Sequence, residues 1–203
     1  MRLAIIAYVL MAGGCGKHGS GGNTDASAGD GSVPDASSIV DAPNGDATGS
    51  TVDCTAYCTA IQSACTGANV QYASAASCIA SCMHLPAGTA GATSGNTLAC
   101  RTMHTQLAQG APSTHCVHAG PSGGATCGTT CEGFCAIAAA SCPTEYPPAS
   151  CATDCAALQA TPPYNATITT GDSVECRLYY ATLAALAPST NCVETGQNGT
   201  MCQ

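Results

Sequence analysis

The spacing of the cysteines constrains the fold of this chain more than any other feature. Apart from Cys15, sixteen cysteines divide into two sets of eight. The gaps between successive cysteines are 3, 6, 12, 3, 17, 15 and 10 residues in the first set and 3, 6, 8, 3, 20, 15 and 9 in the second. We interpret this agreement as an internal repeat of about 75 residues. The cysteines are Cys54, Cys58, Cys65, Cys78, Cys82, Cys100, Cys116 and Cys127, then Cys131, Cys135, Cys142, Cys151, Cys155, Cys176, Cys192 and Cys202.

Other residue types repeat with the cysteines. The segment Asn96-Thr-Leu-Ala-Cys-Arg aligns with Asp172-Ser-Val-Glu-Cys-Arg. A second pair of segments, starting at Ala111 and Ala187, shares the sequence Ala-Pro-Ser-Thr followed by one variable residue and Cys-Val. The sequence therefore predicts two tandem Cys-rich modules, the first over residues 53–128 and the second over residues 129–203.

The composition explains why such a chain needs cross-links. Leu, Ile, Val and Phe together number 25 residues, about 12% of the chain, which is below the level that usually builds an apolar core. An even number of cysteines in each module is typical of an exported, disulfide-stapled scaffold. Each cross-link contributes about 3 kcal/mol by restricting the unfolded chain.

Periodicity predicts short helices in each module. Asp53 is placed to cap a helix that carries Cys54, Cys58 and Cys65 on one face and ends near Gly67. A second helix is expected to begin at Ser74 or Ser77 and to end before Pro86, with its counterpart in the second module. Asn96 and Asp172 are expected to cap a third helix that ends near Gly110 and Pro112, or near Pro188. The predicted fold class is all-α, small and disulfide-rich, with long loops and a disordered tether in front.

Residues 1–14 are typical of a signal peptide. Arg2 precedes an apolar run over Leu3–Met11, which is far shorter than the roughly 20 residues that span a bilayer. The small residues before Cys15 resemble the lipobox of bacterial lipoproteins. The resemblance implies that Cys15 is acylated and begins the mature chain, and that Gly16 after it directs the protein to the outer membrane, facing the periplasm or the cell surface.

Residues 15–52 carry the expected acylated cysteine and a tether. Residues 16–52 are mainly small and polar, with Asp recurring every five or six positions. Such a segment cannot bury enough apolar surface to fold, and as a coil it would span roughly 30–35 Å. We therefore expect the protein to attach to its membrane partner through the acyl chains on Cys15.

Two Cys-x3-Cys pairs in each module resemble the twin-CX3C α-hairpins of small mitochondrial Tim chaperones and plant α-hairpinins. In those families the outer cysteines pair with each other and the inner cysteines pair with each other. The resemblance implies the bonds Cys54–Cys82 and Cys58–Cys78. It implies Cys131–Cys155 and Cys135–Cys151 in the second module. The remaining connectivity is left open by the sequence.

Metal binding is the alternative use of these residues. Cysteines four apart on a helix can ligate one ion, and the pattern loosely resembles the Cys-x3-Cys helices of bacterial copper storage proteins. Histidines are a second candidate set, because His104, His115 and His118 all lie in the first module. The second module has Tyr180, Asn191 and Glu194 at those places. A copper or zinc site at these histidines would belong to the first module only, and the alternative is that they are solvent-exposed or loop-packing residues.

The sequence holds no complete catalytic set. Gly120-Pro-Ser-Gly-Gly124 satisfies the Gly-x-Ser-x-Gly string but lies in a Gly-rich loop, where a turn is expected. Four basic residues and a net charge of −8 argue against nucleic-acid binding. We expect a non-enzymatic binding or structural protein without a required cofactor, with an unidentified protein or glycan partner. The open alternatives are an envelope metal or redox protein and a peptidase-inhibitor scaffold with an exposed loop at Gly67–Ala73 or Pro143–Pro148.

Overall fold

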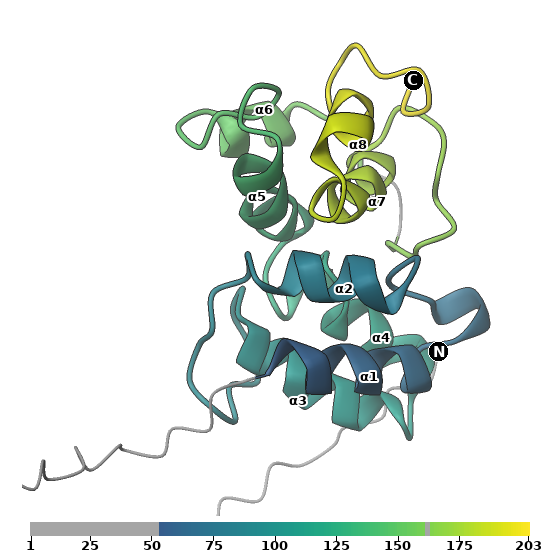
Figure 1. Ribbon diagram of the computed structural model, residues 1–203. Helices are drawn as coiled ribbons and strands as arrows, with labels where there is room; N and C mark the ends of the chain where they lie inside the picture. The colour runs from purple at the N-terminus through teal and green to yellow at the C-terminus, as the bar shows by residue number, and fades with distance from the viewer. Residues whose placement is uncertain (1–52, 161–162) are drawn as a thin grey trace, which may run out of the picture. The chain divides into compact units, whose positions relative to one another are not determined.

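The computed structural model in Figure 1 describes residues 53–160 and 163–203. Every regular element in these ranges is helical, as predicted from the sequence. The predicted signal peptide and tether lie outside the described residues. The α-helices are α1 (Cys54–Ala64), α2 (Ala75–Cys82), α3 (Leu98–Ala108), α4 (Pro112–Ala119), α5 (Thr130–Ser141), α6 (Cys151–Ala156), α7 (Val174–Ala184) and α8 (Pro188–Thr195), and two short 3₁₀ helices are η1 (Gly67–Asn69) and η2 (Gly123–Ala125).

Eight disulfides repeat one connectivity in both halves of the described chain. Numbered along each set, cysteine 1 bonds 5, 2 bonds 4, 3 bonds 7 and 6 bonds 8. The first two bonds of each set are those implied by the twin-CX3C resemblance, and they join α1 to α2 and α5 to α6. The other bonds are Cys65–Cys116, Cys100–Cys127, Cys142–Cys192 and Cys176–Cys202.

The first two helices begin where the polar caps predicted them. The Asp53 side chain accepts a hydrogen bond from the backbone N–H of Thr55 at 2.9 Å. The hydroxyl of Ser74 accepts from the N–H of Ser77, and the Ser77 hydroxyl accepts in return from the N–H of Ser74. Such caps satisfy N–H groups that the first turn of a helix leaves without partners.

The predicted caps of the third helix were wrong by one residue. Thr97 caps α3 and Ser173 caps α7, each accepting from a backbone N–H three residues later. Asn96 and Asp172 instead bind arginines. The Asn96 amide oxygen accepts from Arg101 at 2.9 Å, and Asp172 forms an ion pair with the equivalent arginine of α7 at 2.8 Å. A side chain committed to an arginine is not placed to cap.

Two helices, α4 and α8, were not predicted from the sequence. Pro112 and Pro188 were expected to end the preceding helix, but each proline is the first residue of the next one. Proline suits that position because its ring fixes a helical φ and the missing N–H would have no partner there. These two helices fold back on α3 and α7 and make those hairpins the most extensive helix pairings of each half.

Cystines, tyrosines and alanines build the core. Tyr57 and Tyr72 are each 1% exposed, and their hydroxyls lie 3.1 Å apart. Tyr57 also donates to the carbonyl of Ala119 at 2.6 Å, which ties α1 to the end of α4. Burial raises the pKa of both tyrosines, so both stay neutral. In the second half, Phe134 packs edge-on against Tyr146 at 4.8 Å between ring centroids.

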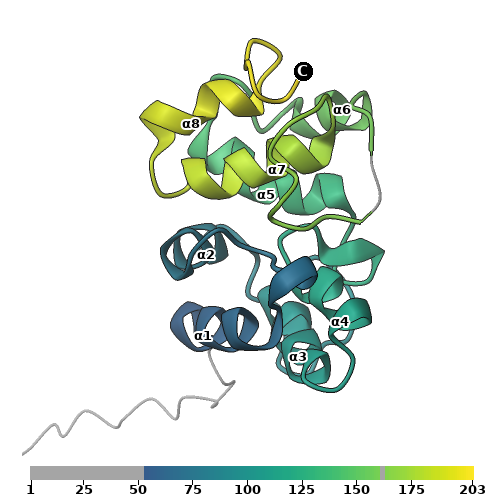
Figure 2. The ribbon, with the colours of Figure 1, turned by 90° about the vertical axis from the view of Figure 1, so that its right-hand side faces the viewer.

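The two halves contact each other through α2 and α7. Figures 1 and 2 both show α2 lying between α1 and the helices of the second half. The Ser81 hydroxyl lies 3.4 Å from the carbonyl of Thr182, and the N–H of Ala166 donates to the carbonyl of Val70 at 2.8 Å. These contacts join segments about a hundred residues apart in the sequence, so the halves share one buried surface.

A buried arginine organises the junction between α3 and α5. Arg101 is fully buried, and its guanidinium donates to the carbonyls of Thr97, Gly120 and Pro121 as well as to Asn96. Burial lowers its pKa, since desolvation disfavours the charged form. Gly133 of α5 lies against the same loop, where a Cβ atom would overlap the Pro121 carbonyl. Only a glycine lets α5 approach this closely.

For the disulfide framework, we expect none of the sixteen cysteines from Cys54 to Cys202 to alkylate before reduction when the chain is exported to a bacterial periplasm. All sixteen should alkylate after reduction. Intact mass measured with and without reduction counts them directly. The same chain made in a reducing cytoplasm is the control, and it should alkylate without reduction. Thiols that alkylate in the exported, unreduced chain would contradict the connectivity where they lie.

For the junction, we expect Gly133→Ala to lower the free energy of unfolding by about 1–3 kcal/mol, because the new methyl group has no room beside Pro121. Thermal unfolding of the disulfide-intact protein, followed by circular dichroism, measures the change. The matched control is Gly110→Ala, where a Cβ would meet nothing closer than 3.9 Å. Equal stabilities for the two variants would show that this close approach is not needed.

Candidate functional site

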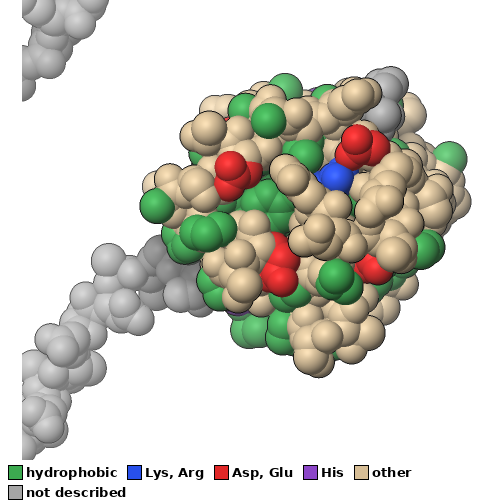
Figure 3. All heavy atoms as spheres, turned by 90° about the horizontal axis from the view of Figure 1, so that it is seen from above, with side chains coloured by type: hydrophobic (Ala, Val, Ile, Leu, Met, Phe, Trp, Pro, Cys, Tyr) green, Lys and Arg blue, Asp and Glu red, His purple; other side chains and the backbone are tan. Residues whose placement is uncertain are grey.

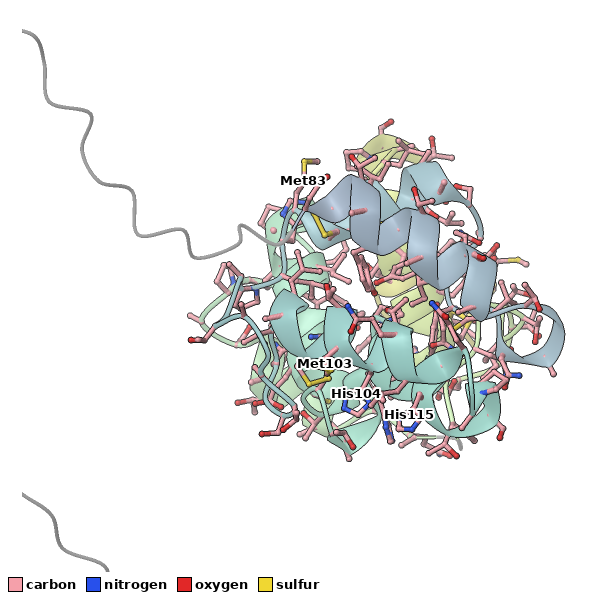
Figure 4. The ribbon with its side chains drawn as sticks, turned by 90° about the horizontal axis from the view of Figure 1, so that it is seen from below. Met83, Met103, His104 and His115 are labelled. Atoms are coloured by element: carbon pink, nitrogen blue, oxygen red, sulfur yellow. A yellow bond between two sulfur atoms is a disulfide. The ribbon has the colours of Figure 1, made fainter. Side chains whose placement is uncertain are left out.

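Three histidines converge on one side of the α3–α4 hairpin. His104 lies on α3, and His115 and His118 lie on α4. One ring nitrogen of each lies within 4.8 Å of the corresponding nitrogens of the other two. Ring centroids are 5.0 to 5.8 Å apart. Figure 4 shows His104 and His115 side by side at the edge of the molecule, on neighbouring helices. The structure thus brings together the three histidines singled out from the sequence.

The hairpin that carries them is fixed by short connections and cross-links. Residues three apart on a helix lie on one face, so His115 and His118 both point from α4 toward α3. Cys116, between them, bonds Cys65 at the end of α1. Cys100, one turn before His104, bonds Cys127 beyond η2. Each helix of the pair is therefore held to another part of the fold close to the histidines that it carries.

Hydrogen bonds define the tautomer of His104 and its contact with His115. His104 Nε2 lies 3.3 Å from the carbonyl oxygen of Thr93. Because a carbonyl only accepts, Nε2 carries the hydrogen, and Nδ1 of the neutral ring holds the lone pair. That Nδ1 lies 3.0 Å from Nδ1 of His115. His104 is 6% exposed, so its ring is held in place by packing as well.

His118 completes the cluster with a polar atom left without a partner. Its Nδ1 is buried and has no hydrogen-bond partner among the described residues. Gly124 packs against the ring, where a Cβ would lie 2.8 Å from Cδ2. Partial burial, together with the charges of His104 and His115 when protonated, lowers the pKa of His118. Because the His118 pKa is lower in the folded than in the unfolded protein, the neutral ring stabilises the folded state. This stabilisation is complete above the unfolded pKa and is lost as the pH falls through the folded pKa.

In the second half, the residues at the three equivalent positions do not form a cluster. Tyr180 replaces the first histidine, and its hydroxyl lies 3.4 Å from the carbonyl of Thr169, the repeat counterpart of Thr93. Asn191 donates to the carbonyl of Ala187 at 3.0 Å. Glu194 accepts from two backbone N–H groups near the C-terminus, each at 2.8 Å. Each of these side chains binds backbone, whereas the first-half side chains face one another.

The donor atoms at this site are imidazole nitrogens. All sixteen cysteines from Cys54 to Cys202 form disulfides, so they offer no thiolate to a metal. This removes the cysteine-based metal alternative and the free-thiol redox alternative for the described residues. Met103, beside His104 in Figure 4, lines an apolar groove between α1 and α3 of about 520 Å³.

The other segments singled out from the sequence are partly packed. Ser122 of the Gly-x-Ser-x-Gly string is 1% exposed, and its hydroxyl lies 3.5 Å from the carbonyl of Val117, as a turn residue would. The proposed inhibitor loop Gly67–Ala73 contains η1 and buries Tyr72. The alternative loop, Pro143–Pro148, is exposed apart from Tyr146.

Sequence reasoning missed two parts of the site, the Thr93 carbonyl and Gly124. Thr93 contributes a backbone carbonyl from the loop before α3, and Gly124 was noted in the sequence only as part of an expected turn. The signal that could have found the first is the repeat itself, since Thr93 and Thr169 are separated by the same 76 positions as Cys100 and Cys176. Gly124 has φ +52°, a conformation that favours glycine.

Residues 36–130 match the BfoA family C-terminal domain. The match covers a little under half of the chain and ends at the first residue of α5, so it takes in α1–α4 and the first set of eight cysteines. The histidine cluster lies within the part that is similar to this domain. No curated protein and no solved structure matches the chain. The match and the eight disulfides fit a disulfide-rich helical repeat protein with a structural or binding role.

For the electrostatics of the cluster, we expect His118 to titrate below its ordinary value of 6.5 in the metal-free protein. His115→Asn should raise the His118 pKa toward that value, because it removes one like charge. The His118 ring proton signals, followed by NMR across the pH range in the presence of a chelator, measure both. His84→Ala is the control and should leave the His118 pKa unchanged. An unchanged His118 pKa in His115→Asn would show that the two rings do not interact.

Proposed function

We propose that this chain is a lipid-anchored protein of the bacterial cell envelope with a non-enzymatic binding or structural role. Its two disulfide-braced helical modules are held away from the outer membrane by the segment that follows Cys15. The observation that carries this proposal is the duplicated disulfide connectivity. A framework of eight bonds forms in an oxidising compartment and therefore supports export.

The N-terminal sequence supports the anchor. The apolar run and small residues before Cys15 resemble a lipobox, whose cysteine receives acyl chains. None of the helices in the described ranges is long and apolar enough to cross a membrane. Attachment through acyl chains would place the helical modules at a membrane without a spanning helix, and two such chains give stable binding.

The distribution of charge favours recognition of a partner by shape and hydrogen bonds. The chain has four Lys and Arg residues, and Arg101 and Arg177 are buried. Figure 3 shows a face made mainly of backbone, uncharged polar side chains and hydrophobic side chains, with separate acidic side chains and a basic side chain beside one of them. A protein or glycan partner suits such a surface better than a nucleic acid, whose phosphates need clustered basic residues.

Variation between the two modules supports a binding role for the α3–α4 hairpin. The cysteines, the proline that starts the second helix of each hairpin and the buried arginine recur in both halves. The positions occupied by His104, His115 and His118 change to residues of different chemistry. Framework positions are thus kept while this hairpin face differs, which is the pattern expected where one scaffold presents different surfaces.

For the anchor, we expect Cys15→Ser to abolish incorporation of labelled palmitate in a bacterial host and to move the protein from the membrane fraction to the periplasmic fraction. The physical reason is the loss of the only acyl attachment that the resemblance implies. Lys17→Ala is the matched control and should label as the parent chain does. Equal labelling of the Cys15→Ser chain would contradict the lipoprotein assignment.

A further inference from the structure

We propose that His104, His115 and His118 form a binding site for one divalent late first-row transition-metal ion, with Cu²⁺ bound more tightly than Zn²⁺. Three imidazole nitrogens would bind the ion, and a fourth position would be left for water or an external ligand. This inference goes beyond the proposed function, which names no ligand. It depends only on the fold of the first half and does not depend on the lipid anchor.

The spacing of the donor atoms suits a single ion. In a tetrahedral site with metal–nitrogen bonds of about 2.0–2.1 Å, two ligand nitrogens lie roughly 3.3 Å apart. His104 Nδ1 and His115 Nδ1 are 3.0 Å apart, and one ring nitrogen from each of the three histidines lies within 4.8 Å of one from each of the others. Small rotations of partly exposed rings on α4 would bring all three nitrogens to one ion. An ion would also replace the shared proton between the first two rings.

The Thr93 carbonyl provides the outer contact that a metal-binding histidine needs. Ligating histidines usually donate their other ring N–H to a carbonyl or carboxylate, which fixes the tautomer and the ring orientation. His104 Nε2 makes this contact at 3.3 Å, and the lone pair on Nδ1 is directed into the cluster. The ring is therefore already in the tautomer that binds a metal.

The second half shows that these positions do not require histidine for folding. Tyr180, Asn191 and Glu194 satisfy their polar groups on nearby backbone. In the first half, the His118 Nδ1 atom is buried without a partner among the described residues. An unpaired buried polar atom destabilises the fold, and an ion bound at that nitrogen would supply the partner that it lacks.

The charge and softness of the site point to the class of ion. The three donors are neutral nitrogens. The residues of α3 and α4 include no carboxylate, and their two cysteines are disulfide-bonded and offer no thiolate. Hard ions such as Mg²⁺ and Ca²⁺ prefer oxygen ligands, whereas imidazole suits zinc and copper. Within the divalent series, copper binds nitrogen sites most tightly. His115 and His118 are partly exposed, so an ion can reach the donors from solvent.

The test uses the whole exported chain, stripped of metal with a chelator, and titrates it with Zn²⁺ or Cu²⁺ alone. His104→Tyr and His115→Asn place in the first half the residues that the second half carries, so a folded hairpin is expected in both variants. Circular dichroism and the thiol count after reduction check that folding. His84→Ala and His18→Ala are the matched controls, because these are the other two histidines of the chain.

We expect the parent chain and both controls to bind one equivalent of either ion, with Cu²⁺ the tighter. His104→Tyr and His115→Asn should weaken binding at least about 100-fold. The Cu²⁺ complex of the parent chain should show electron paramagnetic resonance couplings to ring nitrogens, and both variants should show fewer of these couplings because each lacks one imidazole. Undiminished affinity in either folded variant, or a parent chain that binds neither ion, would overturn the proposal.

Discussion

The 1–5, 2–4, 3–7, 6–8 disulfide connectivity is the constraint on which the rest of this structure depends. Each helix in residues 53–160 and 163–203 has at most twelve residues, a length that is marginal without tertiary support. The 1–5 and 2–4 bonds fix a helical hairpin, and the 3–7 bond attaches the end of that hairpin to the fourth helix. Bonds that close loops of this length each contribute about 3–4 kcal/mol by restricting the unfolded chain. The folded state can therefore use small residues, chiefly alanine, in places where other proteins need leucine.

The cysteine spacing was enough to predict the repeat, and helical periodicity gave the fold class. The hairpin bonds were implied only by the resemblance to twin-CX3C hairpins, and the structure confirms them. Helix ends were less predictable. Pro112 is equally compatible with ending one helix and beginning the next, and only the return of α4 onto α3 decides between them. Asn96 has good capping chemistry, but a buried arginine five residues later competes for the same side chain. Both errors arise where a tertiary contact overrides a local preference.

The histidine cluster illustrates the same limit at the level of the site. The sequence identified the three residues from their absence in the second module, but it could not show that they converge. Convergence depends on α4, which the sequence analysis had not predicted, and on the Cys65–Cys116 bond that holds α4 beside α3. The Thr93 carbonyl belongs to the backbone, so no residue type in the sequence indicates its role as the hydrogen-bond partner of His104.

The two buried arginines show how the duplicated framework can diverge without losing its fold. Arg177 has an ion pair with the exposed Asp172 at the surface of its module. Arg101 occupies the equivalent place, but α5 covers it and its partners are carbonyls and an amide. A buried guanidinium needs all its hydrogen bonds satisfied, so the loop from Gly120 to Pro121 must hold one conformation. That loop directly follows the α4 turn that carries His118. The contact between the halves therefore also fixes the end of the hairpin that carries the histidines.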